Sequence, residues 1–125
     1  MSELTDATVF SKFYPIVLKR AVSKKELEEM LKNLIQSIGK PLAHNGVIIG
    51  HIKLIAGLSD KGFLFLSLTR LDRVDITPLS EWNCEGNEVI SLDLTINVLI
   101  FGHSKGVINE VVNASIAELC LMYNH

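Results

Sequence analysis

Cysteine is scarce in this sequence: its 125 residues include only Cys84 and Cys120. The two lie far apart, with no Cys-x-x-C pair and no companion cysteines. A scaffold held by several disulfides and a four-cysteine zinc site are therefore excluded. The two thiols are typical of reduced intracellular cysteines, and a single disulfide between them is the alternative.

Long apolar runs are also missing. No uninterrupted stretch approaches the roughly 20 apolar residues that a membrane-spanning helix needs. The first residues, Met-Ser-Glu-Leu-Thr-Asp, carry acids where a signal peptide carries basic residues, and no apolar segment follows them directly. We therefore expect a soluble, cytoplasmic protein without a membrane partner.

Neither sign of charge dominates the chain. Fourteen acidic and twelve basic side chains are scattered along it and give a formal net charge of −2. A protein built mainly to bind nucleic acid carries a basic face. Nucleic acid is therefore the least favoured of the partners that we consider.

Known catalytic and cofactor motifs are absent from the sequence. It has no Walker A loop, no dinucleotide-binding glycine fingerprint and no nucleophile elbow. The spacings of His44, His51, His103 and Cys84 match none of the usual zinc sites. We expect no cofactor and no metal, and the sequence leaves open whether the protein is an enzyme.

What the sequence does contain is enough apolar material for a core. Hydrophobic residues make up 48% of the chain. A chain of this length can bury a core without disulfides or a metal. We expect a single domain over residues 1–125.

The stretch Val89–Phe101 alternates between apolar and mostly polar side chains with a period of two. One face would carry Ile90, Leu92, Leu94, Ile96, Val98 and Ile100. This period is typical of a strand with one buried face and one wet face. We expect the stretch to be the longest and central strand of a sheet.

Residues 8–22 allow two interpretations. The apolar residues from Phe10 to Leu18 are spaced like one face of a helix, but Pro15 lies among them and removes a backbone donor. Proline is acceptable at the start of a strand, and the residues that follow are partly β-branched. A strand over Phe13–Val22 is therefore preferred, with the helix as the alternative.

An amphipathic helix is predicted after residue 22. Ser23 and Glu26 have the spacing of a capping box. The apolar residues that follow recur on one helical face. They are Leu27, Met30, Leu31, Leu34, Ile35 and Ile38. Gly39 predicts the end of the helix, and Pro41 disfavours its continuation.

The remaining segments predict further strands and a second helix. A hairpin is expected within Gly46–Leu71, with its turn at Gly57–Gly62, followed by a short strand at Arg73–Thr77. Trp82, in the connector that follows, is expected to anchor that loop against the sheet. A final helix follows Gly106. Its apolar arc would consist of Val107, Ile108, Val111, Val112, Ser115, Leu119 and Met122.

These elements together predict an α+β fold. One-sided helices need a surface to cover, and alternating strands supply it. We expect a two-layer sandwich, with a mostly antiparallel sheet of four to five strands and two amphipathic helices on one face.

The junction after the long strand is the first candidate site. A strand is joined to a helix here by Gly102, His103, Ser104, Lys105 and Gly106. Free backbone amides, a helix dipole and a lysine would lie together, as in sites that hold a small phosphate or carboxylate. The favoured structural alternative is that Ser104 caps the helix, Gly102 eases the turn, and the other side chains are solvated.

His51 and Lys53 form the second candidate site, because they project from an otherwise apolar strand face. An imidazole there could transfer a proton near neutral pH or bind a ligand. The favoured alternative is the solvent face of an edge strand, where lysine discourages pairing with other chains. A polar ligand could also lie across Asp93, Thr95 and Asn97, although alternation alone accounts for polar residues there.

The leading functional hypothesis is a small non-catalytic binding or accessory domain that forms a homo-oligomer. Both faces of the predicted hairpin carry apolar residues, which is more than a monomer usually exposes as one patch. Those on the outer face are Val47, Ile49, Ile55, Phe63, Phe65 and Leu71. The alternative is an enzyme or ligand sensor that binds a small anionic ligand at Gly102–Gly106, with His51 or His103 handling the proton.

Overall fold

The structure, a computed structural model, describes residues 6–58, 62–79 and 88–123. Within them, five strands and two helices follow one another in the order β1, α1, β2, β3, β4, β5 and α2. The strands are Thr8–Val22 (β1), Val47–Gly57 (β2), Phe63–Arg70 (β3), Arg73–Leu79 (β4) and Val89–Ile100 (β5). The helices are Lys24–Leu42 (α1) and Lys105–Tyr123 (α2).

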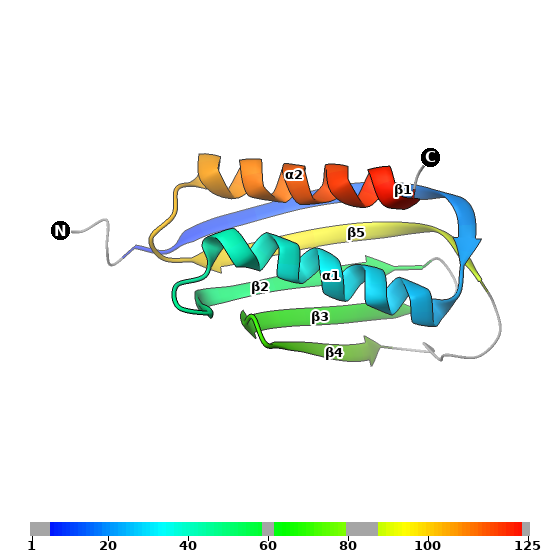
Figure 1. Ribbon diagram of the computed structural model, residues 1–125, viewed down its shortest axis with the longest axis horizontal. Helices are drawn as coiled ribbons and strands as arrows, with labels where there is room; N and C mark the ends of the chain where they lie inside the picture. Colours follow the sequence, from blue (N-terminus) through cyan, green and yellow to red (C-terminus); the bar gives the residue numbers. More distant parts are fainter. Residues whose placement is uncertain (1–5, 59–61, 80–87, 124–125) are drawn as a thin grey trace.

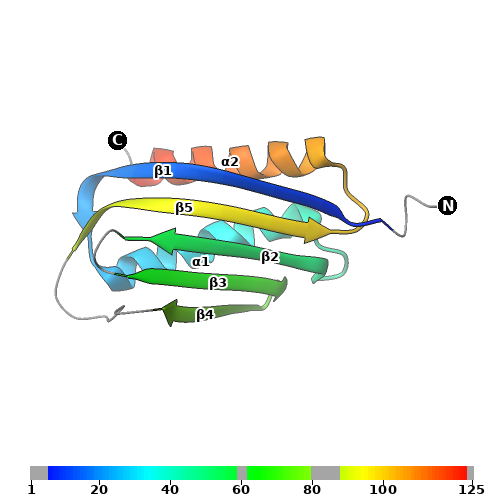
Figure 2. The same cartoon turned by 180° about the vertical axis from the view of Figure 1, so that it is seen from behind.

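The strands form one sheet in the order β1-β5-β2-β3-β4, and every neighbouring pair is antiparallel. Both helices lie on the same side of it, with α2 packed on β1 and α1 packed on β2 and β3 (Figure 1). No described helix or strand covers the other side (Figure 2). The predicted α+β two-layer sandwich is confirmed, and we call the uncovered side the open face.

Residues 8–22 form a strand, β1, and not the alternative helix. It begins at Thr8, earlier than the predicted start at Phe13. The apolar residues that resemble a helical stripe divide between the two sides of the sheet: Phe10 is buried under the helices, whereas Phe13 lies on the open face. Pro15 is accommodated because β1 is an edge strand, and one of its sides makes no ladder bonds.

α1 begins as the sequence predicts. Ser23 Oγ accepts a hydrogen bond from the amide of Glu26 at 3.0 Å, which satisfies one of the free donors of the first turn. The carboxylate of Glu26 contacts Arg20 at 3.3 Å. The whole predicted apolar stripe is buried against the sheet.

The predicted end of α1 at Gly39 is wrong. The helix continues through Pro41 and ends at Leu42. Gly39 is buried, and a Cβ placed on it would lie 2.5 Å from Leu68 Cδ2 of β3. The glycine therefore allows the helix to approach the sheet closely, which helix-ending rules based on neighbouring residues do not consider.

β5 is confirmed as a strand, but it is neither the longest nor the central one. β1 has 15 residues and β5 has 12, and β5 lies one place from the edge of the sheet. The alternation also fails at its start, because Ile90 is 57% exposed while Val89 is buried. The register between β1 and β5 shifts between Val17 and Val22, and such a bulge changes which side chains face the core.

The β2–β3 hairpin is confirmed, although its predicted turn lies partly outside the described residues. The register of the pair shifts between Val47 and Ile52, where Gly50 has a φ of +136°. A Cβ on Gly50 would collide with the carbonyl oxygen of Leu99 in β5. β2 thus needs a glycine at the place where it bends against its neighbour.

The last predicted elements are largely confirmed. β4 extends the predicted short strand from Thr77 to Leu79, and Trp82 lies outside the described residues. α2 begins at Lys105, slightly before the predicted start. Its arc differs from the prediction in that Val107 is exposed and Ile116 is buried.

The core lies between the sheet and the two helices. The inward residues of all four longer strands and the apolar stripes of both helices form one buried cluster. Neither helix in the described part of the chain combines the length and apolar character needed to cross a membrane.

Candidate functional site

The first predicted site lies where β5 passes into α2. Gly102 has a φ of +90°, a conformation that glycine adopts without steric cost. Ser104 Oγ accepts a hydrogen bond from the amide of Val107 at 3.2 Å, so this serine caps the helix. Lys105 is exposed in the first turn. The structural alternative is thus correct for these three residues: Gly102 eases the turn, Ser104 caps the helix and Lys105 is solvated.

His103 differs from that alternative, which treats it as solvated. Its side chain is half-buried, and Nε2 lies 3.1 Å from the carbonyl oxygen of Leu42 at the end of α1. Its own carbonyl oxygen accepts a hydrogen bond from Thr8 Oγ1 at 2.7 Å. His103 therefore links the start of β1, the end of α1 and the junction itself.

A hollow of about 420 Å³ opens beside this junction. His44 and His103 line it, together with Gly102 and the apolar side chains of Ile49 and Phe101. Two imidazoles can bind an anion through N–H groups or accept hydrogen bonds from a donor. Lys105, which the prediction counted as a ligand-binding cation, is not among the residues that line the hollow.

His51 and Lys53, the second predicted site, lie on the open face of β2. The predicted edge position is wrong, because β2 is the third of five strands. Lys53 Nζ lies 5.9 Å from the centroid of the Phe65 ring, within the range of a cation–π contact. Nδ1 of His51 is buried and has no hydrogen-bond partner in the described part of the chain.

The structure does not bring the two candidate sites together. His103 turns toward the end of α1, in the helix layer. His51 and Lys53 project from the opposite side of the sheet. Of the two histidines proposed to handle a proton beside Gly102–Gly106, only His103 lines the hollow at that junction.

The open face is more apolar than the sequence indicated. Its exposed apolar side chains include Phe13 and Phe63, which are 57% and 46% exposed. Sequence reasoning preferred a strand over Phe13–Val22 but did not divide its residues between two faces, so it missed the contribution of β1. One residue assigned to this face, Leu71, instead packs against the core.

The register of the five strands arranges the open face in rows. We call the row formed by Phe13, Thr95, Ile55, Phe65 and Thr77 the central row. The row on one side of it contains Lys53 paired with Asn97. The row on the other side contains Gly57 paired with Asp93. A basic and an acidic residue are thus placed two residues to either side of an apolar centre.

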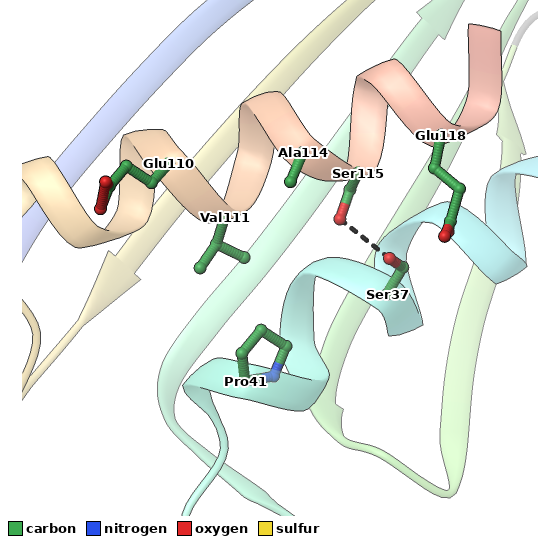
Figure 3. Close-up of a pocket in the computed structure, with 7 residues that line it drawn as sticks. All are labelled: Ser37, Pro41, Glu110, Val111, Ala114, Ser115 and Glu118. Atoms are coloured by element: carbon green, nitrogen blue, oxygen red, sulfur yellow. Dashed lines mark hydrogen bonds between the residues drawn. The ribbon is translucent and has the colours of Figure 1, made fainter. Parts of the chain in front are cut away.

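A groove of about 430 Å³ lies in the helix layer between α1 and α2 (Figure 3). The helices meet there through a hydrogen bond of 2.8 Å between Ser37 Oγ and Ser115 Oγ. Glu110 and Glu118 are on the same helix two turns apart. Because both acids are exposed, they do not form a buried acid pair suited to catalysis.

No cluster suited to a metal was found among the described residues, where no three histidine, cysteine, aspartate or glutamate side chains converge. Cys120 is a free thiol. Cys84 lies in the part of the chain outside that description.

Comparisons with known proteins identify no family. No family model matches the sequence, and no curated protein matches it. A structural comparison matches the chain to a zinc-bound crystal structure of a triple mutant of the GTPase YjiA, with 15% identity and a TM-score of 0.38. The match covers 89% of this chain and 29% of that one, so this chain spans less than a third of the GTPase. A likeness at this level carries no argument about function.

Proposed function

We propose that this chain is a non-catalytic binding domain that associates with further copies of itself through the open face of its sheet. The observation that carries the proposal is the set of apolar side chains on that face, with no described element covering them. An antiparallel sheet with a solvated side normally alternates apolar inward residues with polar outward ones. The central row departs from this pattern with Phe13, Ile55 and Phe65.

Two further features support the proposal. Among the described residues, the two histidines that the sequence offered for proton transfer do not converge: His51 and His103 lie on different sides of the sheet. The chain has only two cysteines, far apart and without a Cys-x-x-Cys pair, which is typical of reduced intracellular proteins and supports a cytoplasmic location.

Light scattering coupled to size exclusion tests the association. At micromolar concentration we expect a mass that is a multiple of the 13.9 kDa chain. Replacing Phe13 and Phe63 together with threonine should shift the protein to the monomer, because threonine keeps the strand propensity and removes both rings. A matched control is Leu121→Gln, which removes an apolar side chain that is 67% exposed on α2. A wild-type monomer would overturn the proposal.

The second candidate function is binding of a small anion in the hollow beside the β5–α2 junction. The specific observation in its favour is that His44 and His103 line the same hollow as Gly102. We expect inorganic phosphate to raise the melting temperature, and His44→Ala to abolish that rise without lowering the melting temperature in water, since His44 is exposed. An unchanged melting temperature across millimolar phosphate would reject this candidate.

A further inference from the structure

The open face contains a hollow of about 310 Å³ beside a carboxylate. The rings of Phe13 and Phe63 line it on two sides, and Gly57, which has no side chain, lies between them. Asp93 also lines the hollow, is exposed and forms no ion pair with any described residue. Two aromatic rings and a carboxylate around a gap form a site suited to a cationic group.

Lys53 supplies a matching cation on the same face. It precedes Gly57 by four residues in β2, and it contacts the Phe65 ring but no carboxylate among the described residues. Four residues of strand span about 13 Å. Lys53 therefore lies too far along its own sheet to reach the end of the hollow formed by Gly57 and Asp93 in its own chain.

We propose that two copies of the chain pair face to face about a two-fold axis that crosses the strands at the central row, so that Lys53 of each copy enters the hollow of the other. The inference rests on the proposed function and specifies its partner and geometry. Under this rotation each strand lies over the same strand of the partner and runs in the opposite direction. The central row then packs on the central row of the partner. Lys53, two residues to one side of that row, then lies over the partner subunit's Gly57, two residues to the other side.

The spacing of packed sheets suits this contact. Sheets that pack face to face lie about 10 Å apart. An extended lysine spans about 6 Å from Cα to Nζ. The ammonium group thus reaches the level of side chains on the opposite sheet, in the hollow that Phe13, Asp93 and the Phe63 ring beside Gly57 line. The partner subunit's Asp93, on the adjacent strand, is in reach of a charge-assisted hydrogen bond.

The same rotation also matches apolar residues near the edge of the face. Val9 pairs with Leu99, four residues to one side of the central row, and Val17 pairs with Ser91, four residues to the other side. Both valines are more than half exposed in the single chain. The rotation places Val9 over the partner subunit's Val17, so that each covers the other.

An axis along the strands would not give these contacts. It keeps each row over its own copy, and the acidic residue in the Lys53 row, Asp75 on β4, already forms an ion pair with Arg73 at 3.2 Å. The axis across the strands is therefore favoured by charge complementarity. When two sheets pack face to face, their strand directions differ by about 30°. The two-fold axis therefore lies about 15° from the perpendicular to the strands.

The available area is sufficient for a dimer. Five strands about 4.8 Å apart and about eight residues long along the face present about 600 Å² on each copy. The two copies together would bury about 1,200 Å², which is at the lower end of the range for stable interfaces. An interface of this size depends on a few strong contacts, and the buried Lys53–Asp93 pairs, formed twice by symmetry, are such contacts.

Charge reversal at the two positions tests the arrangement. We expect Lys53→Asp and Asp93→Lys each to raise the dissociation constant of the dimer at least about thirtyfold, because each change brings like charges together at two symmetric places. The variant that combines both changes should return to within about threefold of wild type. Sedimentation equilibrium gives the constants, and Lys25→Asp on α1 is the matched charge control.

The outcomes separate this inference from the proposed function. Within one chain the two side chains are separated by more than the screening length in physiological salt, so restored pairing must arise between copies. Dimers that are lost in the Phe13/Phe63 double variant but unchanged by either charge reversal would overturn this arrangement and leave the association through the open face standing. A wild-type monomer would reject both. Charge reversals that weaken pairing with no recovery in the combined variant would also contradict the proposed contact.

Discussion

Replacing Gly50 with alanine is expected to lower the free energy of unfolding by at least about 3 kcal/mol. Two effects add at this position. The φ of +136° lies in a region that side-chain-bearing residues rarely adopt, and the new methyl group would collide with the carbonyl oxygen of Leu99. Backbone atoms of β5 cannot move away without disturbing the ladder that joins β5 to both of its neighbours.

Gly46 provides the matched control for this variant. It also has a positive φ, +79°, but a Cβ placed on it would meet no atom within 4 Å. Gly46→Ala should therefore cost only about 1 kcal/mol, which is the conformational term alone. Urea denaturation of both variants at the same protein concentration separates the two terms. Equal losses would show that the approach of β5 to Gly50 contributes nothing to stability.

Leu94→Ala is expected to lower the free energy of unfolding by about 3 to 4 kcal/mol. The side chain is fully buried in β5, beneath the helix layer and between the paired residues Tyr14 of β1 and Ala56 of β2. Its neighbours belong to paired strands and cannot collapse readily into the space that the smaller side chain leaves. The loss thus combines the transfer free energy of the deleted atoms with the cost of a cavity.

The same substitution at Leu121 is the control, because it deletes the same atoms from a side chain that is 67% exposed on α2. It should change the free energy of unfolding by less than about 0.5 kcal/mol. Chemical denaturation monitored by circular dichroism measures both variants. If Leu94→Ala were as mild as the control, the core assigned to the space between β5 and the helices would be wrong.

Elements that depend on neighbouring residues could be predicted well from the sequence. Ser23 caps α1 because the donor it satisfies lies three residues away in the chain. Leu92, Leu94 and Ile96 face the core because a period of two places them on one side whatever β5 pairs with. The layers followed from these local patterns, since one-sided helices must cover one side of a sheet.

Features that depend on distant residues could not be predicted in the same way. Gly39 has the sequence context of a helix end, but Leu68 of β3 requires a residue without a side chain at that point. β2 was expected at an edge because nothing in the hairpin indicates that β5 pairs with its other side. The candidate site on the open face could not be predicted either, because strand pairing brings its residues together. Phe13 and Asp93 share its hollow only because β1 and β5 are neighbours.

The sequence by itself therefore determined the identity of the elements, their inward faces and the two-layer architecture, because side-chain periodicity and caps act over a few residues. Only the tertiary structure decided the strand order, the bulge at Gly50 and the rows that set Lys53 and Asp93 on either side of an apolar centre. Each of these depends on the pairing of strands that are far apart in the chain. Pairing is selected by the packing of the whole core and not by any local pattern.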